Sequence, residues 1–229
     1  MRKFLDLNIR PLKEELRRSM LELAADLGYK GVGLTTEEPP ERGEIYPELD
    51  LVSRVTLRPS NVNDLTKSLR RIRRKYVIIA VECHSKNVAR QAAKDNRVDI
   101  LNFPVSISAR RRVRFDRQEA SLAGGANCVY EVNVSDLLGV GPLILSRLLS
   151  MFREEVENAK RYDVPVIVSS GADEPLMMRE PRSLAAVLSL LGLDEEASLD
   201  AVSTTPWGMV EGNREKLGLG FVMPGVRRT

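Results

Sequence analysis

Histidine is nearly absent from this sequence, because His84 is the only one in 229 residues. Hydrolytic metal centres usually need several imidazoles or a dense set of carboxylates. A cluster of two or three metal ions held by histidines is therefore excluded. A magnesium site made of carboxylates alone remains open, with Asp6, Glu82 and Glu131 as its candidate ligands. His84 has no paired nucleophile, so we expect it to be a hydrogen-bonded residue at a strand end.

Cysteines and long apolar segments are also scarce. Cys83 and Cys128 are the only cysteines, and both fall in strand-like segments, which favours two buried thiols over a disulfide or a redox pair. No segment has the roughly 20 apolar residues that span a bilayer. The N-terminal residues MRKFLDLNIR contain no apolar signal-peptide core. We therefore expect a cytoplasmic protein with no membrane partner.

The net charge of +3 hides a strong asymmetry along the chain. Between Arg54 and Arg117 there are 17 lysines and arginines against 5 acidic residues, a local charge of +12. The rest of the chain carries a charge of −9. Such a basic segment on an otherwise acidic chain is typical of a protein with a phosphate-bearing partner, although a solvated basic face is the alternative.

The apolar pattern predicts strands that alternate with helices. The expected strands cover residues 3–9, 31–35, 51–57, 77–83, 98–101, 128–134 and 164–169. Amphipathic helices are expected between them, one ending at Gly28 and others beginning at a cap on Asn63, at Pro142, at Pro181 and at a cap on Asp194. The segment after residue 101, which holds a cluster of arginines, is expected to be a loop.

This order predicts an α/β fold of parallel βαβ units, an irregular (β/α) TIM-like barrel with about seven strands. No eighth strand is evident, so either the barrel closes irregularly or the sheet is open. We expect residues 1–229 to form a single domain with a flexible C-terminal tail from about residue 217.

Several segments, taken in order, resemble one protein family. They are FLDLNI, LGYKGVGL, RVDILNFP with the arginine-bearing loop and QEASLA, YEVNVSDLL, VPVIVSSGA and GLDEEASLDAVSTTPWGMVEGN. Together they are similar to the archaeal ribonuclease P protein component 3 family, which includes the 30 kDa subunit of archaeal and eukaryotic RNase P. The resemblance covers nearly the whole chain.

The resemblance implies a barrel related to the polymerase-and-histidinol-phosphatase phosphoesterases. Those enzymes carry His-x-His in the first strand, where this chain has Asp6-Leu7-Asn8. Near a late strand they carry an acid followed by alanine and histidine, where this chain has Ser170-Gly171-Ala172-Asp173. Both departures remove metal ligands, so the resemblance implies a barrel with no catalytic residue, no metal site and no cofactor of its own.

The resemblance further implies a protein that assists a catalytic RNA. In this kind of ribonuclease P the RNA holds the magnesium ions and removes the 5′ leader of precursor tRNA. The implied partners are RNase P RNA, protein component 2 in a heterotetramer, other RNase P proteins and, indirectly, precursor tRNA. The residues expected to contact RNA are Arg110, Arg111, Arg112 and Arg114, then Arg90, Lys94 and Arg97, then Arg58, Arg179 and Arg182.

Two alternatives remain at this stage. One is a true barrel enzyme, a metal-dependent phosphoesterase or another enzyme acting at the strand ends. The other is a general RNA-binding module without a fixed partner.

Overall fold

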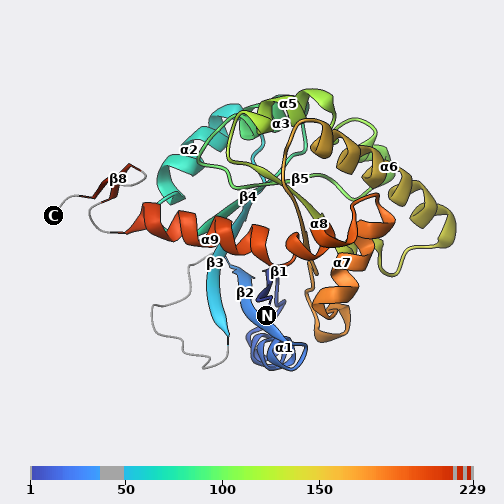
Figure 1. The fold of residues 1–229 in the computed structure, drawn as a ribbon. Coiled ribbons are helices and arrows are strands. Elements are labelled where there is room, and N and C mark those ends of the chain that lie inside the picture. Colours follow the sequence, from blue (N-terminus) through green and yellow to red (C-terminus); the bar gives the residue numbers. More distant parts are fainter. Residues whose placement is uncertain (1, 37–48, 219–220, 224–225, 228–229) are drawn as a thin grey trace.

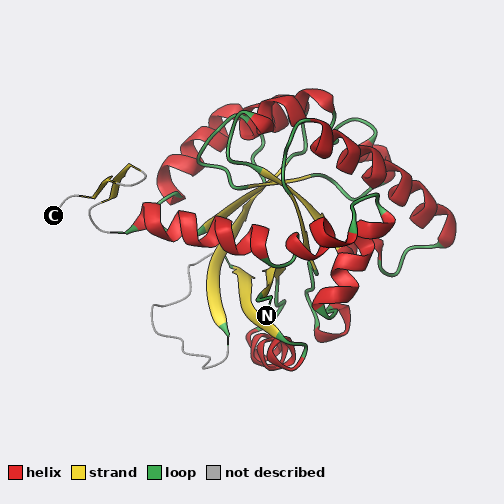
Figure 2. Ribbon diagram, in the orientation of Figure 1, coloured by secondary structure: helices red, strands yellow, loops and turns green. Residues whose placement is uncertain are grey.

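Seven parallel strands form one sheet in the order in which they occur in the chain. The structure is a computed structural model that describes residues 2–36, 49–218, 221–223 and 226–227. The strands are β1 Phe4–Ile9, β2 Tyr29–Thr35, β3 Asp50–Leu57, β4 Ile78–Glu82, β5 Ile100–Asn102, β6 Val129–Asn133 and β7 Val166–Ser169. They curl around a common axis, with helices on the outside (Figures 1 and 2). The predicted irregular α/β barrel of seven strands is confirmed.

The helices that connect and cover the strands are α1 Glu14–Asp26, α2 Val62–Ile72, α3 Lys86–Ala93, α4 Ile107–Arg110, α5 Arg117–Gly124, α6 Pro142–Arg161, α7 Pro181–Leu190, α8 Glu195–Asp200 and α9 Thr204–Leu217. Two short 3₁₀ turns, η1 Val134–Leu137 and η2 Pro175–Met177, follow β6 and β7. Several predicted boundaries are confirmed: Gly28 has φ +88° after α1, α6 and α7 begin at their prolines, and the Asp194 side chain accepts a hydrogen bond from the Ala197 amide.

Two local predictions were wrong. The N-cap of α2 is Asn61 and not Asn63, because the Asn61 side chain accepts a hydrogen bond of 3.0 Å from the Asp64 amide and the helix begins at Val62. The segment after β5 is not all loop, because it contains the single-turn helix α4 (Ile107–Arg110). That turn decides which arginines reach the surface.

The barrel closes without an eighth strand in the described residues. Towards their C-terminal ends, β1 and β7 are joined by one parallel bridge between Ile9 and Ala172. Elsewhere along their length, the residues that link α8 and α9 lie between β1 and β7 and bond to both. The Leu5 amide of β1 donates to the Val202 carbonyl (3.0 Å), and the Val168 amide of β7 donates to the Ala201 carbonyl (3.2 Å). A short piece of irregular chain therefore takes the place of the missing strand.

The barrel interior has an apolar layer and a polar layer. The apolar layer lies towards the N-terminal ends of the strands and includes Leu5, Val52, Ile100, Val129 and Ile167. Two residues further along β3, β5, β6 and β7, which is the spacing that returns to the same face of a strand, the chain places Arg54, Asn102, Glu131 and Ser169. The polar layer therefore lies nearer the C-terminal mouth, where barrels bind ligands.

Helix α9 lies across the N-terminal end of the barrel (Figure 1). Its Val210 belongs to the apolar layer, and Asn213 donates hydrogen bonds to the Val77 carbonyl (3.0 Å) and to Asp99 (2.8 Å). Arg214 of the same helix forms an ion pair with Asp50 at the start of β3. These contacts fix α9 to the ends of three strands.

The two cysteines are free and buried, as predicted. No helix in the described part of the chain is long and apolar enough to span a membrane. The flexible tail expected from about residue 217 stays a prediction and falls partly outside the described residues. The described part beyond α9 includes a short antiparallel pair, β8 (Phe221–Met223) and β9 (Val226–Arg227).

Candidate nucleic-acid interface

A buried guanidinium lies at the centre of the polar layer. Arg54 forms two parallel hydrogen bonds to Glu131, at 2.7 and 2.6 Å, and donates a third of 3.0 Å to the Leu7 carbonyl. The same carboxylate accepts from Ser169 (2.6 Å) and Asn102 (3.0 Å). Burial alone would raise the pKa of Glu131, but Arg54 and the neutral donors lower it below its ordinary value. Glu131 is therefore an ionised carboxylate whose hydrogen-bonding capacity is used within the protein.

The three carboxylates considered for magnesium do not form a shared site. Glu131 binds Arg54, whereas Glu82 lies 2.7 Å from Arg58 and 3.0 Å from His84. Asp6 accepts hydrogen bonds from the Asn8 and Ser170 amides, and burial raises its pKa. In the described residues no group of three or more His, Cys, Asp or Glu side chains is placed to hold a metal ion. The donor set does not fit the metal centre of a phosphoesterase.

The mouth above the polar layer is a hollow of about 410 Å³. Amides and hydroxyls line much of it, and several bond one another: Asn8 donates to Asn133 (2.7 Å), and Thr35 donates to Asn8 (2.9 Å). Burial raises the pKa of Asp136, at its edge, to about 6, against the attraction of nearby arginines. Several of these amides and hydroxyls are therefore occupied by one another, whereas the buried Thr56 hydroxyl has no hydrogen-bond partner in the described residues.

Large apolar side chains are exposed at the end of the barrel where this mouth opens. Of the six that the described residues expose, five lie on segments that follow β1, β5, β6 and β7, namely Leu12, Val105, Leu143, Ile144 and Leu176. The sixth, Leu190, lies at the far end of α7. We call the five residues the apolar rim. Exposed apolar side chains that share one end of a folded domain are candidates for contact with another molecule.

Arg110, the first of the predicted RNA contacts, is not at the surface. It is 2% exposed, and its guanidinium hydrogen-bonds to Glu155 and to the Pro104 (2.9 Å) and Phe103 (3.2 Å) carbonyls. It also lies over the Phe152 ring, 4.2 Å from the centroid. Arg110 ties the arginine-bearing segment to α6, and its buried guanidinium is not presented at the surface. Its contact with RNA stays a prediction that this placement does not support.

The next arginines point outward from the same turn. Arg111 and Arg112 are exposed, and Arg114 is half-buried in an ion pair of 2.7 Å with Glu154. Since α4 turns Arg110 inward, it presents Arg111 and Arg112 to solvent. Neither of these two arginines has a hydrogen-bonded or ion-paired partner in the described part of the chain.

Two adjoining hollows collect further cations over α3, α5 and α6. The larger, about 630 Å³, and the smaller, about 280 Å³, share Arg114. Together they are lined by seven cations and three carboxylates, Asp116, Glu154 and Glu157. With the adjacent Arg112, we call these cations the basic face: Lys86, Arg90, Arg111, Arg112, Arg114, Arg117, Arg147 and Arg161.

Arg90 belongs to this face but has an acidic neighbour. Its Nε lies 3.6 Å from Oε1 of the buried Glu119. Burial and the neighbouring Asp116 carboxyl raise the pKa of Glu119 to about 7 against the attraction of Arg90. At neutral pH Glu119 is protonated in a large share of the molecules, so it neutralises Arg90 only in part.

The remaining predicted contacts lie elsewhere. Lys94 is exposed and Arg97 pairs with Asp95 at 2.6 Å, but both precede β5, and neither lines the two hollows. Arg58, which follows β3, pairs with Glu82 at the mouth. Arg179 donates to two nearby carbonyls, and Arg182 is exposed at the start of α7. None of these five lines the two hollows of the basic face.

Sequence analysis missed Arg147 and Arg161. Both lie on α6, more than 25 residues beyond the basic segment. On a helix with a clear apolar stripe they resemble ordinary solvent-facing residues. Only the packing of α6 beside α4 and α5 brings them to the basic face.

Comparison with known proteins decides the family. Residues 3–217 match the family described as RNase P subunit p30. The chain belongs to this family. Ribonuclease P protein component 3 of Methanosarcina barkeri is 30% identical over 215 residues, which is 89% of this chain and 85% of that protein. The Methanothermobacter thermautotrophicus protein of the same name is 26% identical over 98% of this chain and 95% of its own length.

Solved structures support the fold of this p30 family member. A chain in an archaeal ribonuclease P structure with mature tRNA matches over 96% of both chains, with a TM-score of 0.81 and 23% identity. Histidinol phosphate phosphatase from Lactococcus lactis matches over 85% of this chain and 94% of its own, with a TM-score of 0.53 and 11% identity. The family match confirms the sequence-based assignment to the ribonuclease P protein subunits, and the second structure shows the barrel shared with a phosphatase.

Proposed function

We propose that this p30 family protein supports the catalytic RNA of ribonuclease P during removal of the 5′ leader from precursor tRNA, and that the basic face is its RNA contact. The observation that carries the proposal is that some arginines are buried in ion pairs while others are exposed and unpaired. Arg54 and Arg110 form ion pairs with the buried carboxylates of Glu131 and Glu155. Arg111 and Arg112 are exposed without an acidic partner in the described residues. Exposed guanidiniums are suited to bidentate contact with phosphate.

Physically, such a surface assists an RNA by neutralising phosphates that folding brings together. Each neutralised phosphate lowers the repulsion in the compact RNA and so lowers the magnesium concentration at which it forms. In this proposal the magnesium ions are bound by the RNA and the protein needs no cofactor of its own. Two of the nearby carboxylates support that division, since Glu131 is bound to Arg54 and Glu82 is paired with Arg58 and His84.

The basic face has few groups that read bases. Its only described aromatic neighbour in the arginine-bearing segment is Phe115, which is buried and stacked on Tyr130 with ring centroids 4.8 Å apart. A phosphate-contacting surface without aromatic platforms recognises the shape and charge of the RNA backbone. We therefore expect binding that tolerates changes in RNA sequence and responds strongly to salt.

Replacing Arg111, Arg112 and Arg147 with alanine should flatten the salt dependence of RNase P RNA binding. Each lost phosphate contact removes about 0.7–0.9 from the slope of log affinity against log salt, so the triple variant should lose about two to three units. Binding measured at four or more salt concentrations gives the slope. In an enzyme reconstituted from RNA and all protein subunits, the same variant should need more magnesium to cleave precursor tRNA.

The matched control removes three exposed cations from other elements, Lys13, Arg18 and Lys216. Its net charge equals that of the triple variant, so an equal loss of slope in both would show a non-specific charge effect and contradict the assignment of the basic face. Cleavage of precursor tRNA by the isolated protein with magnesium or manganese would favour the alternative, a barrel phosphoesterase.

We further propose that the apolar rim binds RNase P protein component 2, with two copies of each protein in a heterotetramer. The rim supports this because its residues lie on segments that follow four different strands, at the end of the barrel where the mouth opens, and Val105 also lines the mouth. Apolar anchors surrounded by polar groups are typical of protein interfaces. A general RNA-binding module would not need them.

Replacing Leu143 with glutamate is expected to weaken binding of component 2 by about thirtyfold, the effect of losing one central apolar contact of about 2 kcal/mol. Leu190→Glu is the control, because both leucines are 66% exposed but only Leu143 lies on the rim. Calorimetry or size-exclusion chromatography of the mixed proteins measures both. Equal binding by the two variants would place the partner on another surface.

A further inference from the structure

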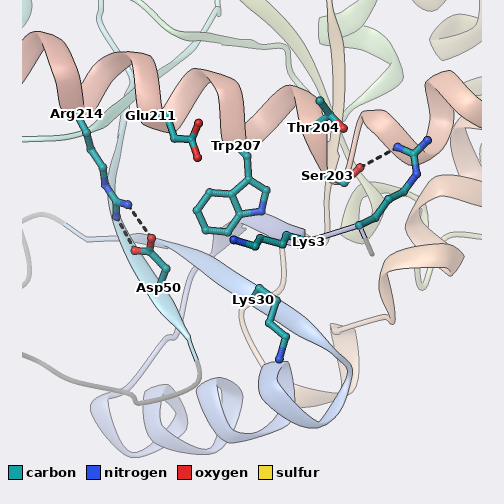
Figure 3. Close-up of a pocket in the computed structure, with 9 residues that line it drawn as sticks. Lys3, Lys30, Asp50, Ser203, Thr204, Trp207, Glu211 and Arg214 are labelled. Carbon is teal, nitrogen blue, oxygen red and sulfur yellow. Dashed lines mark hydrogen bonds and ion pairs between the residues drawn. The ribbon is translucent and has the colours of Figure 1, made fainter.

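A second hollow, of about 580 Å³, opens at the N-terminal end of the barrel, opposite the mouth (Figure 3). Helix α9 provides one wall, and the beginnings of β1, β2 and β3 provide the other. None of its lining residues belongs to the basic face or to the apolar rim. It combines an aromatic ring with cations, which the basic face does not.

The aromatic ring is Trp207, the only tryptophan of the chain. It is partly buried and faces the hollow from α9 (Figure 3). The position of the ring depends on a glycine. A β-carbon at Gly31 would lie 2.9 Å from two atoms of the ring, which is closer than β-carbons approach other atoms in protein structures. The missing side chain at Gly31 lets the indole pack on β2, so the ring is held in place by backbone.

The charged residues that line the hollow are Arg2, Lys3, Lys30, Asp50, Glu211 and Arg214. Arg2 pairs with Asp200, and Glu211 places one carboxylate on the wall formed by α9. Arg214 is bound to Asp50 through two hydrogen bonds of 2.7 and 2.6 Å, and so is occupied. Lys3 and Lys30 are exposed and have no ion pair or hydrogen bond within the part of the chain that the structure describes. Figure 3 shows Lys3 extending towards the indole and Lys30 at the outer edge, with its ammonium directed away from the ring.

We infer that this hollow is a second RNA site that takes an unpaired nucleotide, with its base on Trp207 and the flanking phosphates near Lys3 and Lys30. The inference rests on the proposed function, because it presumes that the chain meets RNA. Base-on-indole stacking with lysines along the backbone is the recurring arrangement of single-strand sites. The volume is that of a pocket for one small ligand.

Unpaired RNA fits this site better than a duplex does. In an A-form helix the bases are stacked on one another and hidden from an aromatic side chain, whereas a loop or bulge can present a base to it. The two ammoniums contact phosphates without fixing a base identity, so the site should tolerate different sequences. The basic face lies over the outer helices α3, α5 and α6, whereas this hollow lies between α9 and the beginnings of β1, β2 and β3, so the two share no lining residue.

Fluorescence tests the site directly, since Trp207 is the only tryptophan in the chain. A single-stranded oligouridylate of about 12 nucleotides should quench its emission, and a duplex RNA of similar length should not. The variant Lys3→Ala/Lys30→Ala should need about tenfold more oligouridylate for half-quenching, because two phosphate contacts are lost. Lys13→Ala/Lys67→Ala removes the same charge from exposed positions outside the hollow and should titrate like the unaltered protein.

Three results would overturn the inference: no quenching by oligouridylate, an equal titration midpoint in both double variants, or equal quenching by polyglutamate, which would indicate an acidic protein partner. Its failure is distinguishable from failure of the proposed function. If oligouridylate does not quench while RNase P RNA still binds through the basic face, only this second site is absent. If RNase P RNA does not bind at all, the proposed function fails.

Discussion

An Arg54→Met variant is expected to lose about 3–5 kcal/mol of its free energy of unfolding. The replacement leaves Glu131 fully buried without its cation, while Asn102 and Ser169 remain as its only side-chain partners. An uncompensated carboxylate in a barrel interior either keeps its charge at high cost or takes up a proton. Urea unfolding of the variant and of the unaltered protein measures the loss.

The loss should depend on pH in a defined direction. In the unaltered protein the pKa of Glu131 lies below its ordinary value, so its contribution to stability is present above the unfolded pKa and is lost as the pH falls through the folded pKa. In the variant burial is no longer opposed by Arg54, and the pKa of Glu131 rises above the unfolded value. The folded variant then binds more protons than its unfolded chain, so its stability falls as the pH rises. The difference between the two proteins should be larger at pH 8 than at pH 5.

Two further variants separate this effect from simple loss of a side chain. Arg54→Met/Glu131→Gln removes both charges and should recover most of the stability, because a neutral amide needs no counter-charge. Arg58→Met removes a cation whose side chain is 66% exposed in its ion pair with Glu82, and should change stability by less than about 1 kcal/mol. A loss below about 1 kcal/mol in Arg54→Met itself would contradict the central role of the guanidinium.

Sequence analysis predicted the strand positions well but not the role of Arg54. In the β3 segment LVSRVTL, successive side chains point to opposite faces of the strand, and each face carries both apolar and polar residues. Either face could therefore point towards the axis of a barrel whose strands are buried on both sides. Arg54 was therefore counted only as the first charge of the basic segment. The pattern Val52-x-Arg54, with Val129-x-Glu131 in β6, becomes meaningful only once the register shows that both pairs point inward.

The closure of the barrel was unpredictable for a different reason. Ala201 and Val202 replace a strand through their backbone carbonyls alone, and the short link between two helices in which they lie has no alternating apolar pattern. What the sequence did show was an absence: seven strand patterns and no eighth. Two departures were also visible in the sequence: where the phosphoesterases that it resembles carry His-x-His and acid-Ala-His, this chain has Asp6-Leu7-Asn8 and Gly171-Ala172-Asp173.

In the arginine cluster, residue spacing alone could have predicted which arginine is buried. Ile107, Arg110 and Val113 are three residues apart, which places them on one face of a helical turn, and Val113 and Arg110 are buried. An arginine between two apolar positions of the same face points inward with them. Because the segment was taken as a loop, all four arginines from 110 to 114 were treated as equivalent surface charges, and the buried partner Glu155 lies 45 residues away.

Replacing Arg110 with alanine should therefore destabilise the fold, while replacing Arg111 should not. Arg110→Ala leaves Glu155 buried with only the Tyr130 hydroxyl as its partner. Burial already raises the pKa of Glu155, against the attraction of Arg110. We expect a loss of about 3–5 kcal/mol, which for a chain of this length lowers the melting temperature by roughly 10 °C. Calorimetry of both variants checks the contrast.

A lysine at position 110 should be a poor substitute. All three guanidinium nitrogens are used, Nε for Pro104, one terminal nitrogen for Glu155 and the other for Phe103, and one ammonium cannot reproduce that planar fork. Arg110→Met/Glu155→Gln should recover more stability than Arg110→Lys, because it removes both charges. If Arg110→Ala instead melted like the unaltered protein and flattened the salt dependence of RNA binding, Arg110 would be a surface phosphate contact. Arg110 would then have to be included in the basic face.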